Sequence, residues 1–427
     1  KMHDAFQARA DQIGLDLTYR AFPVTFWDIW GRQGHPVRTT PAEMGPLLLS
    51  RLLGLTDVQE GVMTIAFRVA DQQGLPLLDL KDLRAMLVWV GQNAAALSQE
   101  FGNVAPASVG AIQRALLVLE TEGGDRLFGE PALALSDLMR RDADGRGMIN
   151  ILSAERLMTA PRLYATFLLW LLSELFEQLP EVGDPDRPHL AFFFDEAHLL
   201  FDGAPKALVD KVEQVARLIR SKGVSIWFVT QNPADIPDAV LGQLGNRVQH
   251  ALRAFTAKDQ KALRDAAQNY RANPDFDISE AIQQVGTGEA VTSFLQPKGV
   301  PGIAQRTLIR PPFSQVGPIT DDQRAAVMAA SGMAARYDTA LDRDSAHEML
   351  ARRTEQAGRG SDADLFQMPG GSRGKPWPPA AKPAPKTGPA RSDSIAQTFG
   401  KSLARQLGTR TGQALVRGVL GSLVRKR

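Results

Sequence analysis

Residues 188 to 201 read PHLAFFFDEAHLLF, and this stretch decides how the rest of the chain is interpreted. Four apolar residues in a row, 191 to 194, lack the alternation of a half-exposed strand, so they predict a strand of a parallel sheet that is covered on both faces. Two carboxylates, Asp195 and Glu196, follow directly. We therefore expect them at the carboxyl end of the strand, where open α/β sheets bind their ligands.

An apolar strand that ends in Asp-Glu is typical of a Walker B segment. In such a segment the first carboxylate, here Asp195, holds Mg²⁺ through water, and the second, here Glu196, polarises the water that attacks a γ-phosphate. The alternative interpretation is that Asp195 only caps the helix that follows it. The neighbouring segments bear on the choice between the two.

Strands and helices alternate on either side of this stretch and predict a doubly wound, mainly parallel sheet. Residues 41 to 124 instead contain helical segments bounded by Gly or Pro with no strand between them, and predict an all-helical insertion or lid. The expected strands are 21–27, 148–152, 190–194, 224–230, 248–252 and 290–309.

This pattern predicts five parts. They are a core (1–40 and 145–313), a helical insertion (41–144), a helical extension (314–357), a flexible linker (358–390) and a basic amphipathic tail (391–427). The linker is rich in Gly, Pro, Ser and Lys and too poor in apolar residues to fold. Glycines in the tail weaken an isolated helix, so we expect the tail to be disordered until a partner orders it.

Composition restricts the classes of protein. The 427 residues include no cysteine, which excludes disulfides and thiolate metal sites, and six histidines without metal-ligand spacing. Nothing at the N-terminus resembles a signal peptide, so the sequence predicts a cytoplasmic protein. The apolar run at 163–172 is too short for a membrane span and predicts a core helix.

Charge is distributed unevenly. From residue 351 onward there are 15 Lys or Arg and 4 Asp or Glu, a net charge of +11. The whole chain has a net charge of +2, so residues 1 to 350 together carry −9. A basic amphipathic tail suits DNA phosphates and an anionic membrane about equally well, and a nuclease is a third candidate partner.

Further polar residues complete the candidate site. Gln231 ends the strand after the Walker B-like strand, so it should lie beside Glu196 and sense the γ-phosphate, unless it is an ordinary turn residue. Arg220, Arg247 and Arg253 flank this segment, and one of them is the candidate arginine finger for a neighbouring subunit. The alternative for each arginine is a solvated or intersubunit salt bridge.

The phosphate cradle of such an enzyme, a P-loop of the form G-x-x-x-x-G-K-[ST], is not found in this chain. The tripeptide Gly-Lys-Ser occurs at 400–402, but Ile395 stands where the first glycine belongs and no strand precedes it. We therefore expect either that the P-loop lies upstream of Lys1 or that the protein is not an ATPase.

Several segments in order and spacing, LAFFFDEAHLLF, ARLIRSKGVSIWFVTQNPADIP, GNRVQHALRAF and GTGEAVTSFL, resemble the HerA/FtsK class of motor ATPases, most closely the bacterial HerA-like (YjgR-type) family. The resemblance covers roughly residues 1 to 320. It implies a RecA-like P-loop NTPase core, a homo-oligomeric ring that in this class is a hexamer, and ATP hydrolysed with Mg²⁺ between subunits. It assigns Walker B to Asp195 and Glu196, the sensor to Gln231, and the interface to Arg247 or Arg253.

Three functions stay open on the sequence alone. The first is a ring ATPase that moves on double-stranded DNA. The second is a motor of the same fold that moves protein, as secretion ATPases do, with the tail as a docking helix. The third is a non-catalytic scaffold that lacks a P-loop.

Overall fold

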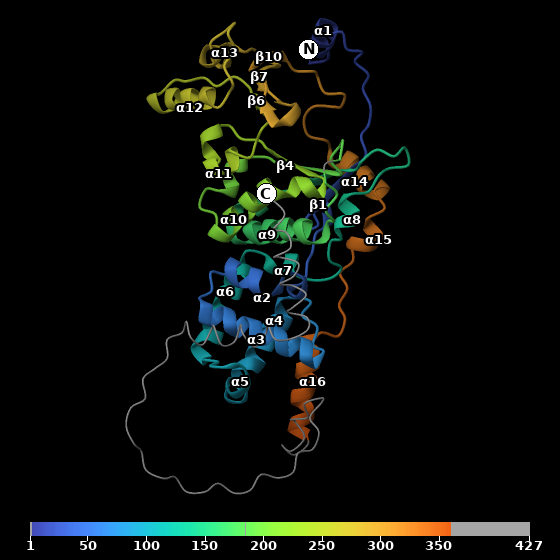
Figure 1. The fold of residues 1–427 in the computed structure, drawn as a ribbon. Coiled ribbons are helices and arrows are strands. Elements are labelled where there is room, and N and C mark those ends of the chain that lie inside the picture. Colours follow the sequence, from blue (N-terminus) through green and yellow to red (C-terminus); the bar gives the residue numbers. More distant parts are fainter. Residues whose placement is uncertain (1, 184, 360–427) are drawn as a thin grey trace, which may run out of the picture. The chain divides into compact units, whose positions relative to one another are not determined.

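The computed structural model describes residues 2–183 and 185–359, and Figure 1 shows their arrangement. The chain divides into two compact units, Lys1–Asp362 and Ala363–Arg427. The second unit, with the predicted basic tail and most of the predicted linker, lies outside the described residues. Within the described part of the chain, no helix is both long and apolar enough to cross a membrane.

Two groups of parallel strands form the β layer of the first unit. β1 (Val24–Asp28) lies between β2 (His35–Pro36) and β3 (Ile149–Leu152), while β4 (Leu190–Phe194) pairs with β5 (Val224–Phe228). Every pair in these two groups is parallel, and Phe194 lies opposite Phe228 at the carboxyl ends of β4 and β5. The two strands therefore end side by side at one edge.

Two long helices cover one face of β4 and β5. α9 (Pro161–Gln178) precedes β4, α10 (Lys206–Leu218) joins β4 to β5, and the two helices pack against each other. Figure 1 shows both helices beside this strand pair. Phe192 and Phe194 belong to the same hydrophobic core as the helices. The predicted core helix at 163–172 is confirmed, because nearly every residue in that run of α9 is buried.

The other face of β4 and β5 is open. Phe193 is 61% exposed and Trp227 is 45% exposed, and their rings stack with centroids 5.3 Å apart. The prediction that the strand at 191–194 is covered on both faces is therefore wrong for the part of the chain that the structure describes. A run of apolar residues shows that both faces of a strand are apolar, but it does not identify the segment that covers each face.

The insertion is helical, as predicted. Two of its helices begin with a reciprocal capping box, at Thr40 with Glu43 and at Asp79 with Asp82. The predicted helical segment that begins at residue 80 breaks at Asn93 into two helices. The helices are α2 (Pro41–Leu52), α3 (Asp57–Gln73), α4 (Leu80–Gln92), α5 (Ala94–Phe101), α6 (Pro106–Thr121), α7 (Gly124–Leu127) and α8 (Leu135–Leu138).

The last predicted strands do not extend the parallel sheet. β6, β7 and β10 form a separate antiparallel sheet with a small hydrophobic core of its own. A short hairpin joins β7 to β10, and a direct hairpin connection produces antiparallel neighbours. The elements are β6 (Arg247–Gln249), α12 (Ala257–Gln268), α13 (Ile278–Gln284), β7 (Glu289–Ser293), β8 (Leu295–Gln296), β9 (Val300–Pro301) and β10 (Gln305–Leu308).

The predicted fold class, an α/β core of mainly parallel strands with a helical insertion, is thus confirmed for β1 to β5. The expectation that strands at 248–252 and 290–309 complete the same sheet is wrong. Alternating strands and helices led to that expectation, and the sequence also gave no sign of α13 between α12 and β7. The division into domains stays a prediction.

The C-terminal described segment is helical, as predicted, and comprises α14 (Asp321–Ala330), α15 (Ala334–Tyr337) and α16 (Ala346–Arg359). We call residues 331–359 the strap. It contacts the β layer through His35, whose fully buried ring lies 2.7 Å from Asp338 Oδ1 and 2.6 Å from Ser331 Oγ.

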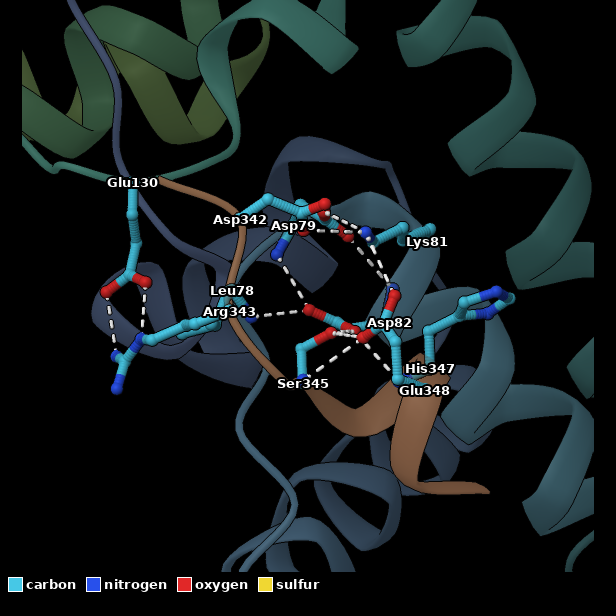
Figure 2. Close-up of polar contacts among 10 residues, drawn as sticks. All are labelled: Leu78, Asp79, Lys81, Asp82, Glu130, Asp342, Arg343, Ser345, His347 and Glu348. Carbon is cyan, nitrogen blue, oxygen red and sulfur yellow. Dashed lines mark hydrogen bonds and ion pairs between the residues drawn. The ribbon is translucent and has the colours of Figure 1, made fainter. Parts of the chain in front are cut away.

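Figure 2 shows where the strap reaches the helical insertion. One oxygen of the buried Asp82 carboxylate accepts hydrogen bonds from the backbone N–H groups of Leu78 (2.9 Å) and Asp79 (3.1 Å). The other oxygen accepts from the His347 N–H (2.9 Å) and the Ser345 hydroxyl (2.5 Å). One side chain thus binds backbone and side-chain donors at the N-termini of two helices, α4 and α16.

Charged groups reinforce this contact. Lys81 Nζ lies 3.1 Å from Glu348 Oε1, and Arg343 makes two hydrogen bonds to the carboxylate of Glu130, of 2.6 and 2.7 Å. The Ser345 hydroxyl also contacts Glu348 Oε2, so its one proton is shared between that oxygen and Asp82 Oδ1. This shared hydrogen bond, more than the ion pair with Lys81, lowers the pKa of Glu348 to about 2. The strap is therefore held by both caps and ion pairs.

Candidate functional site

The Asp-Glu pair lies where β4 ends beside β5. The backbone ladder continues past both strands, because the Val229 N–H donates to the Phe194 carbonyl (2.8 Å) and the Ala197 N–H donates to the Val229 carbonyl (2.9 Å). The segments that follow the two strands are therefore fixed to each other. The polar residues of both segments lie at the carboxyl edge of parallel strands, where α/β sheets bind their ligands.

Glu196 has an unusual backbone conformation. Its φ of 47° and ψ of 51° are left-handed, and in the described residues only Lys298 shares a positive φ among residues other than glycine. This conformation costs a non-glycine residue about 1–2 kcal/mol. The Glu196 N–H donates to Asp195 Oδ1 (3.0 Å), so the two predicted Walker B residues also brace each other.

Gln231 lies beside Glu196, as its position in the sequence predicted. Its Nε2 is 3.2 Å from Oε1 and 3.3 Å from Oε2 of the glutamate. The amide therefore faces both oxygens of the carboxylate. The structure brings these two residues together across 35 positions of sequence, because parallel pairing aligns the ends of β4 and β5.

His198 is a third member of this group that sequence reasoning missed. Its Nδ1 lies 3.4 Å from Glu196 Oε2. The available signal was its place two residues after Glu196 within the DEAH run, in the turn that must follow the strand.

The three predicted arginines lie elsewhere. Arg220 is exposed in a 3₁₀ turn, η3 (Ile219–Lys222), at the amino end of β5, whereas Gln231 follows the carboxyl end. Arg247 in β6 donates to the backbone carbonyls of three residues, 241, 244 and 269. Arg253 is exposed and donates to the carbonyl of residue 283 (2.6 Å). Arg247 thus has more described carbonyl partners than Arg253.

The exposed carboxylate at this edge suits magnesium that is held together with phosphate and water. Asp195 is exposed, and in the described structure only its Oδ1 has a hydrogen-bond partner. No group of three or more His, Cys, Asp or Glu side chains that could hold a metal ion occurs in residues 2–183 and 185–359. Mg²⁺ is commonly bound by one or two carboxylates plus substrate phosphates and water, which this arrangement permits.

Comparison with solved structures finds proteins of low similarity. One is the bacterial conjugative coupling protein TrwBdeltaN70 in complex with sulphate, 12% identical, with a TM-score of 0.43 over 71% of this chain and 78% of that one. Another is the plasmid coupling protein TrwB in complex with ADP and Mg2+, also 12% identical, with a TM-score of 0.40 over 73% of this chain and 75% of that one.

Sequence comparisons are more informative. The "Probable helicase MJECL08" of Methanocaldococcus jannaschii is 27% identical over 124 residues, which are 28% of this chain and 22% of that protein. The chain thus matches about a fifth of the length of this curated relative. The family model described as "Helicase HerA-like C-terminal" matches residues 1–427, the whole chain. The chain therefore belongs to the HerA-like helicase C-terminal family.

Proposed function

We propose that this chain is part of an ATP-hydrolysing motor, in which Glu196 is the general base, Gln231 the γ-phosphate sensor and Asp195 the magnesium carboxylate. The observation that carries the proposal is the contact of the Gln231 amide with both oxygens of Glu196 at the carboxyl edge of β4 and β5. Membership of a helicase family supports it.

The geometry suits hydrolysis. A general base must lie within hydrogen-bond reach of the water that attacks the phosphate. Glu196 offers a partly exposed carboxylate for this, and Gln231 offers both a donor and an acceptor, so it can contact that water and a phosphate oxygen together. Magnesium, held by Asp195 and the phosphates, would supply positive charge that offsets the charge developing on the phosphate oxygens.

The proposal gives this chain the base, the sensor and the magnesium carboxylate, and it does not assign a phosphate cradle within residues 1–427, because the P-loop pattern is not found there.

We further propose that the motor is a ring, hexameric as in the class that the sequence resembles, and that it moves on double-stranded DNA. Arg253 is the favoured finger, because its exposed guanidinium has one described carbonyl partner, whereas that of Arg247 has three. Arg220 at the opposite strand end would act only across an interface.

Turnover of ATP by the full-length protein, with and without double-stranded DNA, tests the proposal. Glu196→Gln should bind nucleotide but hydrolyse it at least about 100-fold more slowly, the usual contribution of a general base. Glu213→Gln is the matched control, because Glu213 lies on α10 in an exposed i,i+4 ion pair with Arg217. The control should turn over ATP at the wild-type rate.

Each result has a distinct meaning. Equal turnover by wild type and Glu196→Gln would refute the assignment of the base. Stimulation by DNA supports a DNA motor, whereas turnover indifferent to DNA would favour a protein cargo. Absence of turnover in all variants would favour a scaffold and overturn the proposal.

A further inference from the structure

His198 has no role in the mechanism proposed above. It lies in a short 3₁₀ turn, η2 (Ala197–Leu200), directly after Glu196. Ala197 and Leu200 have no exposed surface and belong to the main hydrophobic core. The Ala197 N–H is also bonded to the backbone beyond β5. The core therefore fixes the turn at both ends, and His198 is carried between two anchored residues.

The imidazole and the Gln231 amide contact one carboxylate. His198 Nδ1 lies 3.4 Å from Glu196 Oε2, and Gln231 Nε2 lies 3.2 and 3.3 Å from the two oxygens. An imidazole that carries its proton on Nδ1 can donate to the carboxylate. Glu196 is thus held by one group from its own turn and one from the segment after β5.

Glu196 needs such partners. Its side chain is 40% exposed and begins from a left-handed backbone position, outside any helix or strand that would limit its rotamers. A long side chain in this setting loses rotamer freedom only when other groups hold it.

We propose that His198 is the positioning residue of Glu196, which uses its Nδ1–H to hold the carboxylate in the orientation of a general base. The inference rests on the proposed function and deepens it. Gln231 cannot serve alone, because a sensor amide has to contact the γ-phosphate and the attacking water during turnover. His198 is fixed by its anchored turn and keeps its contact when the amide is engaged elsewhere.

Three substitutions of His198 distinguish the role of its Nδ1–H donor from that of the rest of the imidazole ring. His198→Ala removes the Nδ1–H that the proposal places against Glu196 and should lower kcat about tenfold or more, the effect of losing a hydrogen bond to a charged group. His198→Asn places an amide donor where Nδ1 stood and should retain kcat within about threefold. His198→Gln places its amide nearer the Nε2 position and should resemble alanine. The KM for ATP should change less than about twofold, because the proposal places His198 against Glu196 and gives it no part in binding the nucleotide.

A double mutant tests whether the effect passes through Glu196. In the Glu196→Gln background no carboxylate remains to be positioned, so adding His198→Ala should change the residual turnover less than about twofold. A structural role for His198 would instead lower turnover in both backgrounds.

The nucleotide-free protein gives an independent measurement. Nuclear magnetic resonance of the ¹⁵N-labelled histidines, with His198 identified by the signal that His198→Asn removes, should show the Nδ1–H tautomer. Replacing Glu196 by alanine should abolish that preference.

The outcomes distinguish this inference from the proposed function. Wild-type protein without turnover would overturn the proposed function and the inference with it. Turnover that Glu196→Gln abolishes but His198→Ala leaves within about threefold would overturn the inference alone. Equal loss of kcat in His198→Asn and His198→Ala would also overturn the inference alone. So would a His198 ring that is protonated only on Nε2 in the nucleotide-free protein.

Discussion

Replacing Asp82 by alanine should release the strap from the helical insertion. The Asp82 side chain has no exposed surface, and it accepts two hydrogen bonds at the start of α4 and two at the start of α16 (Figure 2). Each of these four hydrogen bonds to the carboxylate contributes about 1 kcal/mol to stability. We therefore expect Asp82→Ala to lower the free energy of unfolding by about 4 kcal/mol.

Urea unfolding followed by circular dichroism measures this change. Asp82→Asn should cost about half as much, because its one remaining oxygen can cap α4 while its amide can still donate to the Ser345 hydroxyl. Asp71→Ala on α3 is the matched control, since Asp71 is exposed, and it should stay within about 0.5 kcal/mol of wild type.

Hydrogen exchange identifies the segment that loses stability in Asp82→Ala. The amides of α16 should exchange at least about tenfold faster in Asp82→Ala, because the N-terminal cap of that helix is removed. If Asp82→Ala unfolds at the same urea concentration as Asp71→Ala and α16 stays protected, the capping argument is refuted.

Two further predictions concern stability. Phe194→Ala should lower the free energy of unfolding by about 3–4 kcal/mol, because Phe194 is 5% exposed. Phe193 lies on the open face and is 61% exposed, so Phe193→Ala should lower it by less than about 1.5 kcal/mol. Equal losses of stability in urea unfolding would contradict the assigned faces. The hydrogen bond from Ser345 lowers the pKa of Glu348 to about 2, so the stability that this carboxylate contributes is present above about pH 4.3, the unfolded pKa of Glu, and is lost as the pH falls through about 2. The difference in unfolding free energy between wild type and Glu348→Gln should therefore shrink between about pH 6 and about pH 2, and a constant difference would argue against the lowered pKa.

Local patterns predicted the elements that their own residues determine. The helices of the insertion followed from apolar spacing and from breaks at Gly or Pro, and the pairing of β4 with β5 followed from two apolar runs joined by one amphipathic helix. The proximity of Glu196 to Gln231 could then be predicted as well, because parallel strands joined by a right-handed crossover end at the same edge of the sheet.

Contacts between distant segments could not be predicted in this way. Ser345 and Asp82 are 263 positions apart, and nothing in the spacing of either residue indicates its partner. The antiparallel direction of β7 and β10 was missed for a related reason, since a short strand has the same alternation in both kinds of sheet. The open face at Phe193 was missed because a run of apolar residues does not identify which segment, if any in the described structure, packs on each face of the strand.

The left-handed conformation of Glu196 depends both on its own turn and on contacts with distant segments. A glycine would adopt φ 47° without strain, so the turn itself gives no reason for a glutamate. The surroundings nevertheless enforce the conformation, because the Ala197 N–H is bonded beyond β5 and Ala197 is packed in the core. The chain therefore carries a strained residue whose carboxylate faces an amide and an imidazole at the carboxyl edge of β4 and β5. Strain of this kind persists where the chemistry of a side chain is needed at a fixed place, which supports the role proposed for Glu196 as the base and for His198 as the group that holds it.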